Sequence, residues 1–204
     1  MKLILIRHGQ PMTGEGAPEC DPPLTPCGEK QAAEAAVALQ SFTPNLLISS
    51  GMRRADQTAA ASARHLGLEV MVDSRFAEVD YGGHPYVDGH MMKARGPQAW
   101  EAFLRDPVGT MGGDEAKMTT RLHAAISDLF DKYKHTKQVI AIFCHAFPIG
   151  LIVTSALGAP AGPRLTRYLP AFCSFTRLVG SSPTQLAMQA FGEAQHVAPY
   201  PPLT

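Results

Sequence analysis

The feature that most constrains this chain is a short apolar run near its first residue, which leads directly into two basic side chains. Leu3–Ile6 is four branched apolar residues, a pattern typical of a strand buried on both faces. Arg7 and His8 follow at once, and Gly9 then interrupts the extended pattern. In open α/β sheets, ligands bind beyond the carboxyl ends of the strands. The run therefore predicts a cation and an imidazole placed for chemistry on an anion, although it also fits a strand that merely reaches water.

Segments typical of strands and helices alternate along the rest of the chain. Strands are predicted at 45–50, 68–72 and 139–143, and two more at 172–179 and 185–191 as a hairpin-like pair. Helices are predicted from Pro26 to about residue 39, with Thr25 as N-cap, and at 53–66, 98–104, 114–133 and 147–157. This alternation predicts a three-layer α/β/α fold, in which a mostly parallel mixed sheet has helices on both faces. We expect one domain over residues 1–204.

The stretch 80–107 differs from its surroundings because glycines and prolines break it repeatedly and only 98–104 has a helical pattern. Such a segment is typical of a small lid over a crevice, here at about 80–110, the kind of loop that carries specificity. The tail at 198–204 contains three prolines and is predicted to be irregular.

Charge and composition exclude several classes of partner. The chain has 18 basic and 18 acidic residues, so a broad electrostatic surface for nucleic acid or anionic membrane is not expected. No apolar run approaches the ~20 residues of a membrane span, and the first run is too short for a signal peptide. Without a secretory signal, the cysteines are interpreted as free thiols of a cytoplasmic protein. They are Cys20, Cys27, Cys144 and Cys173.

Three predicted strands bring basic side chains to the same edge of the sheet. The first ends in Arg7 and His8, the second leads into Arg54, and a later one ends at His145. Two guanidinium groups suit a phosphoryl group because each offers planar, permanently charged donors for paired oxygens. A neutral imidazole can attack phosphorus and form a covalent intermediate. This convergence indicates phosphoryl transfer.

The alkoxide that leaves in such a reaction needs a proton, so a carboxyl group is expected nearby. Glu78 and Asp80 both precede the glycine-rich stretch and are both candidates for this general acid.

The chain resembles the histidine phosphatase superfamily, also called the phosphoglycerate mutase-like family. Leu5–Gly9 resembles its Arg-His-Gly signature, and Ser50–Ala59 resembles the segment that carries its second arginine. Phe76–Gly82 resembles the segment that carries its proton donor. Further matching segments follow the family's order at 21–32, 112–115, 139–145 and 174–176, so the resemblance covers residues 3–179.

The resemblance implies a role for six residues. As nucleophile, His8 would become a phosphohistidine, and Glu78 would protonate the leaving group. The phosphoryl group would be bound by three side chains and by one backbone N–H at a helix start. These groups belong to Arg7, Arg54, His145 and Ala146. The family needs neither a metal nor an organic cofactor, so none is expected here.

The chain departs from the family pattern around the pocket mouth. Pro11 and Gly14 stand where the family often has Thr and Asn, and Gly82–Tyr86 lacks its tryptophan and second acid. Phe172 stands near the position of a family asparagine. These differences indicate a specialised pocket mouth, whereas the residues with chemical roles are all retained.

The extra basic segments of the mutase branch are not found, because Lys93, Arg95 and Arg105 are the only cations of the insertion. We therefore predict metal-independent hydrolysis of a small phosphorylated substrate. A phosphoglycerate mutase-like reaction and a non-catalytic module that binds a phosphorylated ligand are the alternatives, and a homodimer stays open. His84 and His90 lie six residues apart, but no third metal ligand accompanies them.

Overall fold

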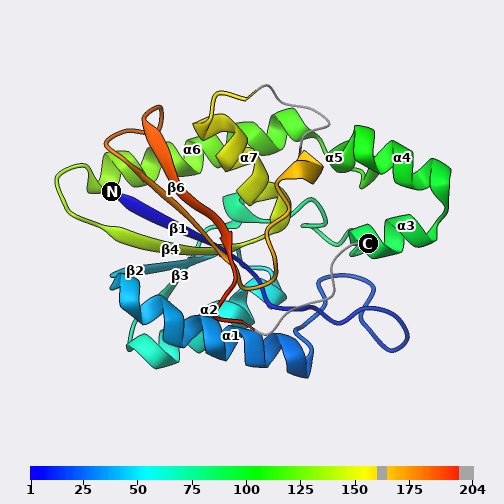
Figure 1. Ribbon diagram of the computed structural model, residues 1–204, viewed down its shortest axis with the longest axis horizontal. Helices are drawn as coiled ribbons and strands as arrows, with labels where there is room; N and C mark the ends of the chain where they lie inside the picture. The colour runs from blue at the N-terminus through cyan, green and yellow to red at the C-terminus, as the bar shows by residue number, and fades with distance from the viewer. Residues whose placement is uncertain (160–164, 198–204) are drawn as a thin grey trace.

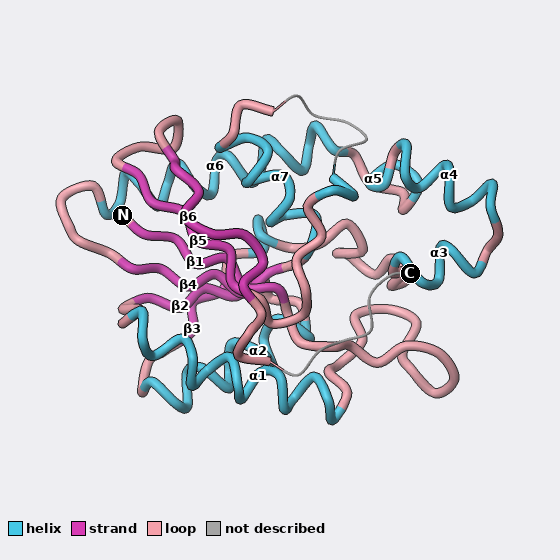
Figure 2. The backbone as a smooth tube through the Cα atoms, viewed as in Figure 1, coloured by secondary structure: helices cyan, strands magenta, loops and turns pink. Residues whose placement is uncertain are grey.

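The computed structural model describes residues 1–159 and 165–197, so the predicted irregular tail at 198–204 lies outside the described residues. Six strands form a single sheet in the order β3-β2-β4-β1-β5-β6 (Figure 2). The strands are β1 (Lys2–Arg7), β2 (Leu46–Ser49), β3 (Val70–Val72), β4 (Val139–Cys144), β5 (Phe175–Gly180) and β6 (Leu186–Glu193).

The first strand lies inside the sheet, as its apolar sequence predicts. β1 pairs in parallel with β4 and antiparallel with β5, while β2 pairs in parallel with both β4 and β3. β5 and β6 form the predicted antiparallel pair at one edge. The prediction of a mostly parallel mixed sheet is therefore confirmed.

Helices cover both faces of the sheet (Figure 1). On one face, α1 (Pro26–Leu39) and α2 (Arg53–Leu66) pack against Ile4 and Ile6. On the other, α6 (Glu115–Tyr133) and α7 (Ala146–Ala156) pack against Leu3 and Leu5. Alternate side chains of β1 thus enter two separate cores, which is why its four central residues, Leu3–Ile6, are all apolar.

Two strands are shorter than predicted. β3 begins at Val70 and not at Leu68, because the Leu68 N–H still closes the last turn of α2 on Ala63 O at 3.2 Å. β5 begins at Phe175 and not at Phe172, because Cys173 adopts a positive φ of 55° in a turn. Pro26–Leu39 and Arg53–Leu66 are helices with the predicted bounds, and the other boundaries, those of β2 included, differ from the predictions by at most two residues.

The expectation that only 98–104 is helical within 80–107 is wrong. The lid holds three helices: α3 (Gly89–Ala94), α4 (Pro97–Arg105) and, at its end, α5 (Pro107–Thr110). Asp88 caps α3 by accepting from the Met91 N–H at 2.8 Å, and Asp106 caps α5 by accepting from the Gly109 N–H at 2.8 Å. Aspartate caps satisfy exposed N–H donors, so even these short segments become helical. The three helices project from one end of the sheet (Figure 1).

Three short 3₁₀ helices complete the described structure: η1 (Gln40–Phe42), η2 (Ser74–Phe76) and η3 (Leu165–Arg167). None of the helices formed by the described residues has the length and hydropathy needed to span a bilayer. All four cysteines are free thiols, and Cys144 and Cys173 are buried.

The loop after β1 is fixed by a close backbone contact with α1. A methyl group on Gly28 would collide with the carbonyl oxygen of Gln10, and one on Gly9 would lie 2.5 Å from the carbonyl oxygen of Gly28. Glycine at both positions therefore lets α1 press directly on the segment that carries His8.

Replacing Gly28 by Ala is expected to lower the free energy of unfolding by about 1–3 kcal/mol, because the added methyl group overpacks this contact. Urea denaturation measures the loss. Val37→Ala is the control, since Val37 lies on the same helix and is 60% exposed. An equal effect of both substitutions would show that the contact is not tight.

Candidate active site

Two histidines meet where β1 and β4 end side by side. The His8 N–H donates to the carbonyl oxygen of Cys144 at 3.0 Å, which ties the two strand ends together. The ring centroids of His8 and His145 lie 5.0 Å apart, and both side chains are buried. The predicted convergence of strand ends is therefore present in the structure.

The hydrogen bonds of His8 fix which ring nitrogen is available. Its Nδ1 lies 2.7 Å from the carbonyl oxygen of Gly9, and its Nε2 lies 3.3 Å from Arg54 Nε. A carbonyl only accepts and a guanidinium only donates, so Nδ1 carries the proton and Nε2 the lone pair. Burial and the nearby charges of Arg54 and Arg7 lower the pKa of His8 well below its ordinary value. His8 is therefore neutral, with Nε2 as the basic atom.

Arg54 is completely buried and lies at the centre of the site. Its Nη2 donates to Asp80 Oδ1 at 2.7 Å, and its Nη1 lies 3.7 Å from Asp21 Oδ1. Nη1 itself has no hydrogen-bond partner within the described residues. The guanidinium is thus paired on one side and has a free donor on the other.

Arg7 is held in a similar way. Its Nη1 donates to the carbonyl oxygen of Pro170 at 2.8 Å, and its guanidinium lies 4.0 Å from the ring centroid of Phe172. Its Nε has no hydrogen-bond partner among the described residues. Phe172, noted above as a departure from the family pattern, therefore stacks on the arginine and orients it.

The two candidate acids have different environments. Asp80 is bound to Arg54, whereas Glu78 accepts backbone N–H groups from Phe147 at 3.2 Å and Val79 at 3.0 Å. Burial, and secondarily the charge of Asp80, raise the pKa of Glu78 to about 7. Glu78 is thus the carboxyl group that holds a proton near neutral pH.

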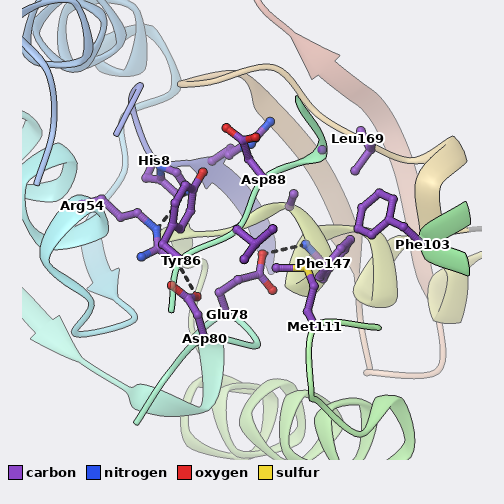
Figure 3. A pocket seen from close by; sticks show the side chains of 14 residues that line it. His8, Arg54, Glu78, Asp80, Tyr86, Asp88, Phe103, Met111, Phe147 and Leu169 are labelled. Atoms are coloured by element: carbon purple, nitrogen blue, oxygen red, sulfur yellow. Dashed lines mark hydrogen bonds and ion pairs between the residues drawn. The ribbon is translucent and has the colours of Figure 1, made fainter. Parts of the chain in front are cut away.

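A small cavity of about 70 Å³ opens between these groups (Figure 3). Five of the six predicted site residues line it: Arg7, His8, Arg54, Glu78 and Ala146. The sixth, His145, is not among the lining residues and packs against His8, with its Nε2 2.8 Å from Ser50 Oγ. Burial and nearby cations also lower the pKa of His145 well below its ordinary value.

The sequence interpretation missed several residues that shape this cavity. Tyr86 lies with its ring centroid 4.9 Å from the Arg54 guanidinium, and Asp88 lines the cavity beside it. Tyr86 belongs to Gly82–Tyr86, where the departure from the family pattern is the only sequence signal, and no sequence signal marks Asp88.

Arg121 was also missed, because nothing in the sequence of α6 distinguishes it from an ordinary surface cation. Its Nη2 donates to the carbonyl oxygen of Ala77 at 2.6 Å, and its Nη1 donates to those of Ser74, at 3.4 Å, and Arg75. The side chain therefore fixes the backbone immediately before Glu78.

No group of three or more His, Cys, Asp or Glu residues within the described part of the chain has the geometry to hold a metal ion. His84 and His90 are both exposed on the lid and do not line the cavity.

Comparison with known proteins decides the family. A model described as "Histidine phosphatase superfamily (branch 1)" matches residues 3–187. The chain belongs to this superfamily. Among curated relatives, a probable phosphoglycerate mutase from Salmonella choleraesuis (strain SC-B67) is 27% identical over 172 residues, covering 79% of this chain and 77% of the relative.

Solved structures show the same fold. Mycobacterial glucosyl-3-phosphoglycerate phosphatase superposes with a TM-score of 0.79 at 22% identity, covering 95% of this chain and 99% of that one. Phosphoserine phosphatase from Entamoeba histolytica, in complex with 3-phosphoglyceric acid, superposes with a TM-score of 0.73 at 22% identity, covering 97% and 99%. At these identities the likeness supports the fold and says nothing about substrate.

The raised pKa of Glu78 predicts a pH-dependent effect of Glu78→Gln on stability. Native Glu78 keeps its proton up to about pH 7, whereas the unfolded chain releases it near the ordinary pKa of 4.5. The free energy of unfolding of the wild type therefore falls as pH rises from about 4.5 to 7, and that of Glu78→Gln does not show this fall. Relative to wild type, the variant is expected to gain roughly 3 kcal/mol between pH 4 and pH 8.

Denaturant unfolding at both pH values measures this change. Glu101→Gln is the control, because Glu101 is an exposed glutamate on α4. A difference between Glu78→Gln and wild type that does not vary with pH would contradict the raised pKa.

Proposed function

We propose that this protein hydrolyses phosphomonoesters without a metal ion, through a phosphohistidine at His8. The observation that carries the proposal is the pairing of a neutral imidazole with two buried guanidinium groups around one cavity. Arg54 Nη1 and Arg7 Nε are buried donors without partners among the described residues, and a phosphoryl group supplies the acceptors that they need.

In the first step, the Arg54 Nε–H turns from His8 Nε2 to a phosphoryl oxygen, and the freed Nε2 lone pair attacks phosphorus. The P–N bond forms as the bond between phosphorus and the leaving oxygen breaks, and the Glu78 carboxyl group gives its proton to that oxygen. Arg7 and Arg54 stabilise the charge on the equatorial oxygens, which is the main demand of phosphoryl transfer.

In the second step, a water molecule attacks the phosphohistidine. The Glu78 carboxylate takes a proton from this water, the P–N bond breaks, and the imidazole recovers its lone pair as inorganic phosphate forms. Glu78 thereby returns to the protonated state in which it began. The Ala146 N–H at the start of α7, which lines the cavity, serves as a further hydrogen-bond donor to the phosphoryl group. His145 packs against the His8 ring, and the donor that it would offer to the phosphoryl group is Nδ1, which has no partner among the described residues.

A mutase reaction is the second candidate, because the curated relatives are named probable phosphoglycerate mutases. A mutase must hold a phosphorylated acid after the first step and exclude water. Among the described residues that line the cavity, Arg7 and Arg54 are the only Lys or Arg side chains, and both are assigned to the phosphoryl group. Hydrolysis therefore accounts better for the site.

The test is turnover of p-nitrophenyl phosphate in excess EDTA by wild type and by His8→Ala. We expect EDTA-resistant activity that falls by about 10³-fold or more in the variant, because the nucleophile is lost. His135→Ala, an exposed histidine beyond α6, is the matched control and is expected to keep full activity.

Activity that survives His8→Ala would overturn the mechanism. Absence of activity in wild type, combined with tight binding of inorganic phosphate, would favour a non-catalytic module that binds phosphorylated ligands. Transfer of phosphate between positions of phosphoglycerate, without release to water, would favour the mutase.

Glu78→Gln is expected to separate substrates by their leaving groups. An alkyl phosphate needs a proton on its leaving oxygen, so kcat/KM, which reports the first step alone, should fall by about 10²–10⁴-fold. Nitrophenolate leaves as a stable anion, so kcat/KM for p-nitrophenyl phosphate should fall far less, by about tenfold. Steady-state kinetics on both substrates measures the difference, and equal losses in kcat/KM would remove Glu78 from the acid role.

A further inference from the structure

The walls of the cavity beyond the phosphoryl site are apolar on one side. Phe103, Met111, Phe147 and Leu169 line it there, contributed by the lid, by α7 and by the segment after η3. Phe103 and Phe147 pack against each other with ring centroids 6.3 Å apart. A leaving group bound in the cavity therefore contacts mainly carbon atoms on this side.

The ionisable side chains that line the rest of the cavity are acidic. Beyond His8, a tyrosine and the two arginines assigned to phosphate, they are the carboxyl groups of Glu78, which holds a proton, and of Asp80 and Asp88. Figure 3 shows Asp88 on one side of the cavity and Glu78 and Asp80 on the other. Burial lowers the pKa of Arg7, and the nearby charge of Asp88 is among those that partly raise it.

The cations of the lid do not enter this cavity. Arg95 lines a separate hollow on the other side of Tyr86 and Val87, where its Nη1 lies 3.5 Å from Met92 Sδ. Lys93 and Arg105 are exposed and line neither space. Within the part of the chain that the structure describes, no third cation faces a substrate whose phosphoryl group lies on Arg7 and Arg54.

We propose that the site selects phosphomonoesters whose leaving alcohol is uncharged or cationic, and that Asp88 is the residue that rejects a carboxylate there. The inference rests on the proposed phosphatase activity. A carboxylate in so small a cavity would be desolvated against Phe103 and Phe147 and repelled by Asp88. A hydroxyl or ammonium group in the same place would instead be attracted by the Asp88 carboxylate.

The inference favours one substrate class over another with the same phosphoryl chemistry. Glycerol 3-phosphate and 3-phosphoglycerate differ by a hydroxymethyl group in place of a carboxylate, and phosphoethanolamine and phosphoserine differ by the carboxylate alone. In both pairs the first compound is the expected substrate. The class of reaction that supplies such a substrate is phosphorylation of a neutral or amino alcohol.

The experiment measures kcat/KM for both pairs with wild type and Asp88→Asn. In wild type, the substrate without a carboxylate is expected to be favoured by about tenfold or more, as the repulsion of two charges at close range predicts. Asn caps helices about as well as Asp, so the substitution keeps the N-cap of α3. The preference is expected to shrink by about fivefold or more in Asp88→Asn.

Asp106→Asn is the matched control, because Asp106 also caps a lid helix but does not line the cavity. It is expected to leave the preference unchanged. Asp88→Ser, in which serine again supplies a cap, replaces Asp88→Asn if that variant does not fold.

Each outcome separates this inference from the proposed function. Turnover of p-nitrophenyl phosphate with a preference for 3-phosphoglycerate or phosphoserine would overturn the inference and leave the phosphatase activity intact. A preference that Asp88→Asn does not reduce would remove Asp88 as its determinant. No turnover of any monoester, p-nitrophenyl phosphate included, would instead overturn the proposed function.

Discussion

The site depends on one fully buried guanidinium. Arg54 has no exposed surface, and an unpaired charge in that position would cost several kcal/mol of desolvation. Asp80 at 2.7 Å offsets this cost, and His8 Nε2 at 3.3 Å accepts a further hydrogen bond. Because Arg54 is held on two sides, its free Nη1 is fixed in direction before any ligand arrives. Such preorganisation avoids reorganisation during the reaction.

The same burial sets the protonation states that the proposed chemistry needs. Burial and two nearby cations keep His8 neutral. Glu78, which is buried and accepts the Phe147 N–H, keeps a proton to about pH 7. At neutral pH, His8 is therefore unprotonated at Nε2 and Glu78 carries the proton that the acid must give. With its ordinary pKa, Glu78 would instead be a carboxylate at this pH. Arg121 adds to this arrangement from outside the cavity, because it binds the carbonyl oxygen of Ala77 and so fixes the backbone next to Glu78.

The sheet and the convergence of basic residues could be predicted because both depend on local sequence. A strand that is apolar at every central position must lie inside a covered sheet. The residues that follow it must lie where the strands of the sheet end. The lid could not be predicted in this way. Its short helices depend on single caps at Asp88 and Asp106 and on packing of Phe103 against distant α7. The Arg121 contact joins residues 44–47 positions apart, so no local pattern reports it.

In the proposed mechanism, His8 attacks through Nε2 because the carbonyl oxygen of Gly9 holds the proton of Nδ1. The direct measurement is the site of phosphorylation in the trapped phosphoenzyme. After rapid alkaline quenching during turnover, the phosphorylated peptide is identified by mass spectrometry and the substituted ring nitrogen by ³¹P and ¹⁵N NMR. We expect a single phosphohistidine at His8, bonded through Nε2. Phosphate on Nδ1, or on another residue during full turnover, would contradict it.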